Sequence, residues 1–202
     1  MDFRCDQSQG VHFIYILPFS STNALVESTR ISETLCPQKF YKEEIKTYLS
    51  QKLDCSEYRI ISEEYGKIPM GQLTKHDSRY LGIGSNGNCI RKSSGYAFNS
   101  IQQQARRIAS QISQGKVVQK QDEIPLTFTK LETILDSIFV NSLKNQPHKA
   151  PEYFIKISKR LTGDEFASFM SGKTSLNVLF KIIFALPKMP FLKAWFQMIR
   201  SS

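Results

Sequence analysis

The arrangement of apolar and polar positions near the start of the chain is typical of β-strands. Residues 11–19, "VHFIYILPF", are mainly apolar in both alternating sets, which predicts a strand covered on both faces. The following "SSTN" has turn chemistry, and residues 24–31, "ALVESTRI", alternate as a second strand. Residues 57–70, "EYRIISEEYGKIPM", predict a further strand that ends in a turn.

Helical periodicity governs most of the remaining chain. Residues 38–53 have this spacing, and a second apolar stripe follows a glycine-rich loop and ends at Gly115. The stripe consists of Tyr96, Ile101, Ala105, Ile108 and Ile112. Five more helices are expected at about 127–145, 151–160, 163–171, 174–186 and 190–199, with prolines between them. Strands first and helices last predict the α+β fold class.

Composition indicates a globular protein without a metal site. The chain has 202 residues, of which 41% are hydrophobic and 22% charged, enough for one domain and an appendage. The four cysteines and three histidines are widely scattered, without a CxxC pair or a Ser/His/Asp spacing. We therefore expect no zinc site and predict free or buried thiols in a reducing compartment.

The positive charge is concentrated in the second half of the chain. The net charge is +9, and residues 116–202 carry 13 Lys and Arg against 7 Asp and Glu. Such a surplus suits nucleic acid or an anionic membrane surface, while a solvated basic face is the plain alternative. No nucleic-acid signature accompanies it, and the apolar residues of this tail, Trp195 among them, favour a membrane surface.

The same tail is not expected to cross a bilayer. Its most apolar stretch, "LNVLFKIIFALP", is too short for a membrane span and contains Lys181. The first ten residues are polar and acidic, unlike a secretory signal. We therefore predict a cytoplasmic protein with peripheral membrane association.

Glu27 is the candidate catalytic acid. Its neighbours on one face of the expected strand are Leu25, Thr29 and Ile31. If that face is interior, loss of water around a carboxyl group favours its protonated form and keeps a proton available for general acid catalysis. The alternatives are an exposed face or a carboxylate paired with a lysine.

Glycines at 82, 84 and 87, in "RYLGIGSNGN", have the G-x-G-x-x-G spacing of a dinucleotide-binding turn. That turn requires a helix at once and an acidic residue about 20 positions later. The next helical pattern begins only near Ser94, and no Asp or Glu lies between Gly87 and Asp122, so a Rossmann turn is not supported. A helix opened by Ser93, Ser94 and Gly95 offers free N–H groups to an anionic or carbonyl-rich cofactor, or is a plain N-cap.

Four segments, in order along nearly the whole chain, resemble the flavin-dependent lycopene cyclase family (lycopene β-cyclase type). "GVHFIYILPFSSTNALVESTRIS" is similar to its strand pair with an acidic motif, and "EEYGKIPM" to its E-x-G-x-I-P-M stretch. "GIGSNGNCIRKSSGYAFNSIQQQARRIA" is similar to its glycine loop, K-P-S-T-G-Y and helix. "GDEFASFMSGKTSLNVLFKIIFALPKMPFL" is similar to its helical tail.

The resemblance implies roles for particular residues. It places Gly84, Ser85, Asn86 and Gly87 near a flavin nucleotide, and Ser94, Gly95 and Tyr96 near the isoalloxazine end. Glu27 falls on the first acid of the F-L-E-E-T-like motif, here "LVEST", which is implied to protonate the polyene or to stabilise the cation. Ser28 stands at the second acid, and Arg91 and Lys92 stand at the lysine and proline of K-P-S-T-G-Y.

The resemblance also implies an incomplete cyclase. The family's N-terminal half, with the true Rossmann fingerprint for flavin adenine dinucleotide (FAD), has no counterpart in these residues. We expect the C-terminal half of a flavin-dependent cyclase/oxidoreductase fold, which binds FAD weakly or not at all by itself. It would be a truncated gene product, an incomplete gene model, or one piece of a split enzyme with a separate N-terminal FAD-binding half. Residues 1–78 would form the substrate-side sheet region with one helix, 79–115 the part that completes the FAD domain, and 116–202 the helical, membrane-associating tail.

The function implied is the cyclisation of lycopene ψ end groups with reduced FAD and without net redox change, an intramolecular lyase (isomerase) reaction of carotenoid biosynthesis. Two alternatives stay open. One is a non-catalytic module at a membrane surface, and the other is a flavin-dependent isoprenoid reductase on the same scaffold. The choice between β and ε rings is also open.

Overall fold

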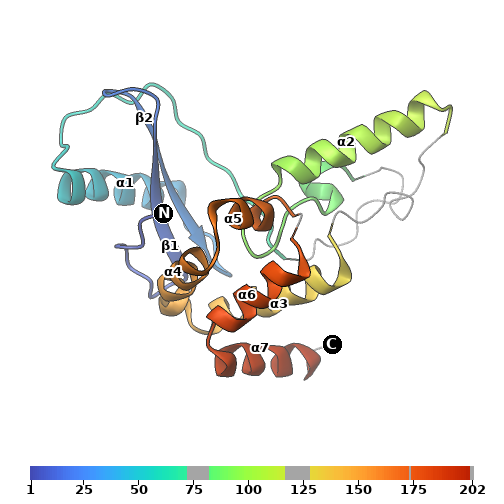
Figure 1. The fold of residues 1–202 in the computed structure, drawn as a ribbon. Coiled ribbons are helices and arrows are strands. Elements are labelled where there is room, and N and C mark those ends of the chain that lie inside the picture. Colours follow the sequence, from blue (N-terminus) through green and yellow to red (C-terminus); the bar gives the residue numbers. More distant parts are fainter. Residues whose placement is uncertain (72–81, 117–127, 173, 201–202) are drawn as a thin grey trace. The chain divides into compact units, whose positions relative to one another are not determined.

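A computed structural model of the chain describes residues 1–71, 82–116, 128–172 and 174–200 (Figure 1). It contains two compact units. Unit 1 comprises Met1–Gly66 and Leu143–Glu152, and unit 2 comprises Lys67–Ser142 and Tyr153–Ser202. Strands come first in the chain and helices dominate its remainder, which confirms the α+β class.

Unit 1 is built on a β-hairpin. Strands β1 (Val11–Pro18) and β2 (Ala24–Ile31) pair antiparallel, and the register places Tyr15 opposite Glu27. The backbone N–H of Phe19 donates to the carbonyl of Asn23 at 2.8 Å and closes the turn predicted from "SSTN". The second strand was predicted with these boundaries and the first to within one residue, because turn residues separate two apolar segments.

Helix α1 (Gln38–Leu53), which its apolar spacing predicted, covers one face of this hairpin. The ring of Phe40 on α1 lies 5.8 Å from the ring of His12, and the guanidinium of Arg30 lies 5.4 Å from the same phenyl ring. The helix ends at Asp54, which has a left-handed φ of 52° and donates its backbone N–H to Leu49. One face of the hairpin is thereby sealed by a helix.

The two-sided burial expected of the first strand holds only for its first half. Phe13 and Ile14 lie on opposite faces and are 7% and 0% exposed, whereas Leu17 is 49% exposed. Leu25, the partner of Leu17 across the hairpin, is also exposed. The hairpin therefore begins in the core and ends in an open apolar surface.

The further strand predicted within residues 57–70 is wrong, since these residues form no strand in the structure. Ile60, Ile61 and Ile68 are exposed there. An extended segment needs a partner for its backbone N–H and C=O groups, and the described sheet consists of β1 and β2 alone.

The remaining helices confirm the predicted helical tail to within a few residues. They are α2 (Phe98–Ser113), α3 (Lys130–Asn145), α4 (Ala150–Arg160), α5 (Gly163–Met170), α6 (Leu176–Ala185) and α7 (Lys188–Arg200), with 3-10 turns η1 (Gly84–Gly87) and η3 (Pro147–Lys149). Thr162 and Glu165 form a capping box that starts α5, and Ser175 caps α6. The end of α3, η3 and the start of α4 belong to unit 1.

Aromatic side chains from α3, α4 and α7 pack together in unit 2. The ring of Phe139 lies 5.7 Å from Phe154 and 6.0 Å from Phe191, and Phe191 lies 5.3 Å from Tyr153. The side-chain amide of Asn141 also donates to the carbonyl of Ala194 at 2.9 Å. These contacts hold α7 against α3 and α4 by one side.

Candidate functional site

Glu27 is held by two hydroxyl groups on one face of the hairpin. The phenolic hydroxyl of Tyr15 donates to one carboxylate oxygen, and the Thr29 hydroxyl donates to the other at 2.7 Å. Tyr15 is the cross-strand partner of Glu27, and Thr29 follows two residues later on the same strand face. The geometry of the sheet alone therefore brings both hydroxyl donors to the Glu27 carboxylate.

Tyr15 is a functional candidate that the sequence interpretation missed. Burial, with the bond to Glu27 adding to it, raises the pKa of Tyr15 to about 12. Tyr15 therefore keeps its proton at neutral pH and remains a donor. The signal that could have found it was the hairpin register, since positions 15 and 27 lie equally far from the centre of the turn.

The surroundings of Glu27 change along the face. Glu27 is half-buried, with the buried Phe13 on one side and the exposed Leu17 and Leu25 on the other. No lysine or arginine of the described chain forms an ion pair with Glu27, so the paired-carboxylate alternative lacks support. Exposed apolar side chains therefore lie beside the carboxylate on this strand face.

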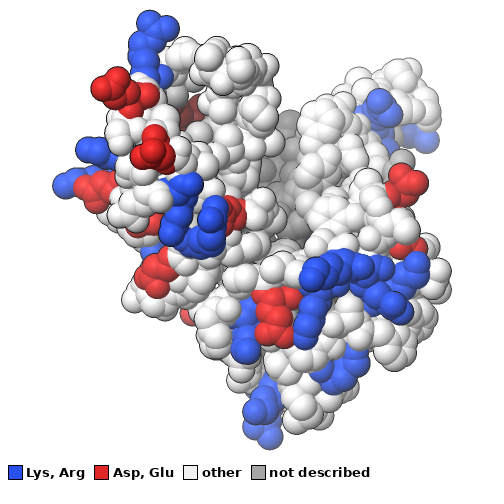
Figure 2. Space-filling view, turned by 60° about the vertical axis from the view of Figure 1, so that its left-hand side comes forward, with Lys and Arg blue, Asp and Glu red and all other residues white. Residues whose placement is uncertain are grey.

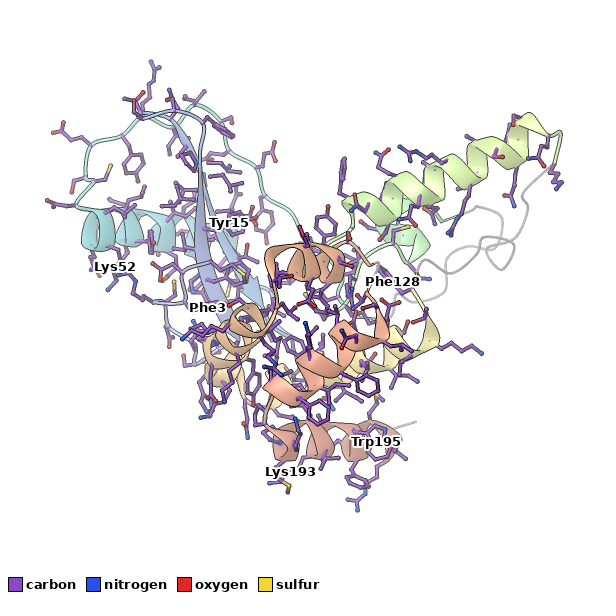
Figure 3. The ribbon with its side chains drawn as sticks, in the orientation of Figure 1. Phe3, Tyr15, Lys52, Phe128, Lys193 and Trp195 are labelled. Atoms are coloured by element: carbon purple, nitrogen blue, oxygen red, sulfur yellow. The ribbon has the colours of Figure 1, made fainter. Side chains whose placement is uncertain are left out.

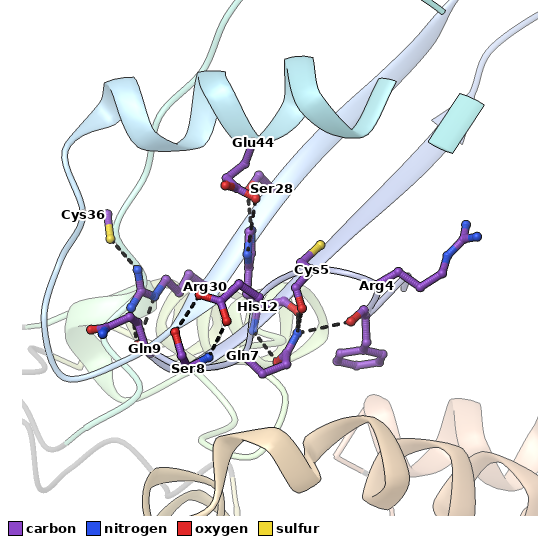
Figure 4. A network of polar contacts seen from close by, with 12 residues as sticks. Arg4, Cys5, Gln7, Ser8, Gln9, His12, Ser28, Arg30, Cys36 and Glu44 are labelled. Atoms are coloured by element: carbon purple, nitrogen blue, oxygen red, sulfur yellow. Dashed lines mark hydrogen bonds and ion pairs between the residues drawn. The ribbon is translucent and has the colours of Figure 1, made fainter. Parts of the chain in front are cut away.

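Ser28 lies on the opposite face of the hairpin from Glu27, in a polar network under α1 (Figure 4). Its hydroxyl lies 2.9 Å from Nε2 of His12, and Nδ1 of His12 lies 3.9 Å from a carboxylate oxygen of Glu44. The Gln7 amide accepts from the backbone N–H of His12 at 3.0 Å and donates to its carbonyl at 2.6 Å.

This serine, histidine and glutamate resemble a nucleophile with its base, but their setting makes them packing residues. His12 is only 1% exposed, and burial lowers its pKa, with Glu44 opposing that shift. A neutral imidazole that is sealed beneath a helix cannot meet a substrate. Consecutive strand residues point to opposite faces, so Ser28 and Glu27 do not share a pocket.

The glycine loop in unit 2 is folded around a glutamine of α2. Gly84 has a left-handed φ of 59°, and a Cβ added at Gly87 would lie 2.5 Å from Nε2 of Gln104. The Gln104 amide accepts from the Gly84 N–H at 2.7 Å and donates to the Gly87 carbonyl at 3.2 Å. Gly87 thus makes room for Gln104, whereas Ser85 and Asn86 of the same loop are exposed.

Gln104 is a second residue that the sequence analysis did not identify. It is 3% exposed, although it lies outside the apolar stripe that predicted this helix. Within that stripe Ala105 and Ile112 are exposed, so the stripe does not mark the buried side of α2 in the described residues. The predicted end of the helix is confirmed, because Gly115 has a φ of 72° and donates its N–H to Ile112.

A tight turn separates the glycine loop from α2. The carbonyl of Arg91 accepts from Ser94 at 3.3 Å and from Gly95 at 2.8 Å, and Arg91 donates its N–H to the Tyr96 carbonyl at 2.9 Å. Gly95 has a φ of 71°, and an added Cβ there would have open space. The backbone of this turn can therefore be approached closely at Gly95.

The predicted serine N-cap of α2 is wrong. The helix begins at Phe98, and Ala97 stands at its N-cap without a side-chain hydrogen bond. The left-handed Gly95 reverses the chain after Ser93 and Ser94, so neither hydroxyl reaches the first turn of the helix.

Arg91 anchors this turn to the helical part of unit 2. Its side chain is 1% exposed, and Nε lies 3.3 Å from the Asp136 carboxylate on α3. Nη1 lies 3.2 Å from the Thr174 hydroxyl and also donates to the Phe169 carbonyl, while the guanidinium carbon lies 4.4 Å from the Phe169 ring centroid. A second carboxylate oxygen, from Glu132, lies 3.9 Å from Nη2.

Burial in this cluster changes the pKa of Asp136. Burial raises the pKa of its carboxyl group, and Arg91 and Ser93 oppose the rise. The cluster has nearly no contact with water, so its charges serve each other and hold the turn in place. Of the candidate residues, Glu27 lies in unit 1, and those from Gly84 to Tyr96 lie in unit 2.

A comparison with protein families shows which family the chain belongs to. The family model described as "Lycopene cyclase protein" matches residues 1–195. The chain belongs to the lycopene cyclase family. The matched residues include Glu27, the glycine loop, Arg91 and the helices up to α7.

The family match confirms the resemblance drawn from the four quoted segments. No curated protein and no solved structure matches the chain significantly. In the described residues of this lycopene cyclase family member, we find no helix with the length and apolar character that a membrane span needs.

Proposed function

We propose that this member of the lycopene cyclase family takes part in converting ψ end groups of lycopene to rings, with Glu27 as the acid. The observation that supports this most is the setting of Glu27. Its carboxyl group is oriented by Tyr15 and Thr29 and lies beside the exposed, apolar Leu17 and Leu25. An acid that must protonate a hydrocarbon needs both a fixed orientation and an apolar approach.

The proposed reaction begins when Glu27 transfers its proton to the terminal double bond of the polyene. The carbon–carbon bond of the ring then closes through a carbocation, and loss of a neighbouring C–H proton restores a double bond. One proton is added and one is lost, so the product is an isomer of the substrate. Tyr15 and Thr29 stabilise the ionised Glu27 by donating hydrogen bonds to it.

Ser28 changes what the motif can do in this chain. Its side chain contacts His12 on the helix-covered face, so the second motif position adds no carboxylate beside Glu27. Glu27 therefore carries the acid or cation-stabilising role alone.

The proposed cofactor is reduced FAD, which would supply negative charge that stabilises the carbocation. The described residues fit an approach by such a group at two places. The backbone at Gly95 is open, between Ser94 and Tyr96, and Ser85 and Asn86 are the exposed members of the glycine loop. The Gly84 N–H and Gly87 carbonyl already bind Gln104, so these glycines shape the loop that the nucleotide would contact.

The two rivals differ in observable products. An isoprenoid reductase would add two hydrogens to its product, whereas cyclisation leaves the mass unchanged. A non-catalytic membrane-surface module would leave lycopene unaltered. The oriented Glu27 beside an apolar surface argues against the non-catalytic module, which needs no acid. Reduction of a double bond also consumes a proton, so the mass of the product separates the cyclase from the reductase.

The test is Glu27→Gln, which keeps the shape of the side chain and removes its ionisable proton. The chain would be expressed in lycopene-producing cells with a flavin-binding N-terminal half of a cyclase from the same family. We expect cyclised carotenoid to fall about a hundredfold or more. Glu43→Gln is the matched control, since Glu43 is an exposed carboxylate on α1. If Glu27→Gln cyclises like the parent, Glu27 is a structural carboxylate.

A further inference from the structure

Helices α6 and α7 expose large apolar side chains in regular stripes. On α6 these are Leu176, Phe180, Ile183 and Phe184, and on α7 they are Leu192, Trp195, Phe196 and Ile199. Phe184 is 71% exposed and Phe196 is 56% exposed. We call these eight residues the α6–α7 apolar face.

The spacing shows that each stripe is one side of a helix. The α6 set falls at i, i+4, i+7 and i+8, and the α7 set at i, i+3, i+4 and i+7, which aligns each set along one helix face. The opposite side of each helix packs inward, with Val178, Leu179 and Ile182 buried on α6 and Ala194 buried on α7. The apolar face is therefore a second apolar side, beyond the one that the fold uses.

A short bend joins the two helices that carry these stripes. Leu186 follows α6, and α7 begins at Lys188, whose ammonium lies 5.2 Å from the Phe184 ring centroid. Lys188 also donates to the carbonyls of Ile183 and Leu186, which ties the start of α7 to the end of α6.

Net positive charge is concentrated in the part of the sequence that contains α6 and α7. Acidic and basic side chains are mixed on the surface drawn in Figure 2, so the net charge alone does not locate a binding surface. Along the sequence, however, residues 166–202 contain no Asp or Glu and five basic residues, namely Lys173, Lys181, Lys188, Lys193 and Arg200. Nearly all of the surplus charge of the tail thus lies in and around α6 and α7.

Two of these basic residues border the apolar stripe of α7. Lys193, Phe196, Gln197 and Arg200 line an open hollow on this helix, and Lys193 and Trp195 both project from α7 (Figure 3). Neither Lys193 nor Arg200 forms an ion pair with a carboxylate of the described chain, whereas Lys181 pairs with Glu165 at 2.5 Å. Apolar residues bordered by cations are the pattern of a helix that lies in a lipid headgroup region.

We propose that the α6–α7 apolar face docks on an anionic phospholipid leaflet, with the aromatic side chains among the acyl chains and Lys193 and Arg200 at the phosphates. This inference gives a location to the peripheral membrane association that the sequence predicts. Helices of 10 and 13 residues are too short to cross the bilayer, so they lie along its surface. A second copy of the chain is a poorer occupant, because it would bring the same positive rim against itself.

Trp195 makes the docking directly measurable, because it is the single tryptophan of the chain. The experiment mixes the full chain with phosphatidylcholine vesicles that contain phosphatidylglycerol, and follows Trp195 emission. We expect a shift to shorter wavelength and quenching by lipids brominated on their acyl chains. Binding should weaken as salt is raised, because the cationic rim is screened.

Substitutions on the face should weaken binding selectively. Phe184→Ser and Phe196→Ser should each reduce vesicle affinity about tenfold or more, because each removes a phenyl group from the acyl region. Lys193→Glu with Arg200→Glu should reduce it by a similar factor at low salt. The controls are Ile112→Ser, an exposed apolar residue on α2, and Lys52→Glu, an exposed cation on α1.

Melting curves by circular dichroism would show whether each variant folds. If a phenylalanine variant is destabilised, the charge variants decide, since Lys193 and Arg200 hold no buried partner of the described chain. The proposal is overturned if Trp195 stays unquenched, or if the controls weaken binding as much as the face variants. It is also overturned if the chain dimerises without lipid and Phe196→Ser abolishes the dimer. Cyclase activity enters none of these readouts, so a failure here is separate from a failure of the proposed reaction.

Discussion

Glu27 in unit 1 and Arg91 in unit 2 both have ionisable side chains with several polar partners, but their surroundings differ. Glu27 receives two hydroxyl donors and stands beside exposed leucines. Arg91 is 1% exposed and faces two carboxylates, a hydroxyl, a carbonyl and a phenyl ring. A charged group that keeps one open side can react with a ligand, whereas one that is enclosed on all sides determines the fold.

The largest effect on stability should come from breaking the enclosed cluster. Arg91→Met removes the guanidinium and leaves Glu132 and Asp136 as buried carboxylates without their cation. We expect the free energy of unfolding to fall by about 3–5 kcal/mol, measured by denaturant titration. Arg106→Met, at an exposed position on α2, should stay within about 0.5 kcal/mol of the parent.

If Arg91→Met were as stable as Arg106→Met, the cluster would not hold the turn. Arg91→Lys sharpens the test further. It keeps the charge but loses the planar fork of donors, so its stability should fall between that of the parent and that of Arg91→Met.

The open carboxylate should respond in activity and hardly in stability. Tyr15→Phe removes one of the two donors to Glu27 and leaves Thr29. A hydrogen bond to a charged group contributes about 1.5–3 kcal/mol, so cyclisation should slow about tenfold or more. Tyr58→Phe, at an exposed tyrosine outside the hairpin, is the control. Equal rates for Tyr15→Phe and the parent would show that Tyr15 does not assist Glu27.

The strands and helices show what the sequence could and could not predict. Periodicity predicted both strands and every helix, because those elements depend on neighbours within a few positions. It failed for residues 57–70, whose β-rich composition found no partner strand among the described residues. It also failed at Ser94, where a left-handed Gly95 reverses the chain before the helix.

The candidate site shows the same division. The resemblance to the family's acidic motif made Glu27 a candidate, and the hairpin register contained its partner Tyr15. The partners of Arg91 could not be predicted, since Phe169 and Thr174 lie 78 and 83 residues away in the chain. Gln104 lies close to the glycine loop only because α2 packs back on η1, and no local pattern encodes that contact.

The smallest expected effect is a pH dependence from the enclosed cluster. Burial raises the pKa of Asp136 above the ordinary value of 3.8. The folded chain therefore gains stability from protonated Asp136 at a pH below 3.8. This contribution to the free energy of unfolding is lost as the pH rises through the raised pKa of Asp136. Asp136→Asn should remove this loss, so the difference in unfolding free energy between variant and parent should change as pH rises from about 4. A difference that stays constant over that interval would contradict the raised pKa of Asp136.

The central claim is that ring closure begins with a proton from Glu27 and involves no net reduction. It can be tested by supplying lycopene in vesicles, with reduced FAD and the flavin-binding half of a related cyclase, in deuterated water. The account predicts a product that has the mass of lycopene in ordinary water and gains one deuterium for each ring in deuterated water. Glu27→Gln should give neither product. A product heavier by two hydrogens in ordinary water, or full cyclisation by Glu27→Gln, would contradict the account.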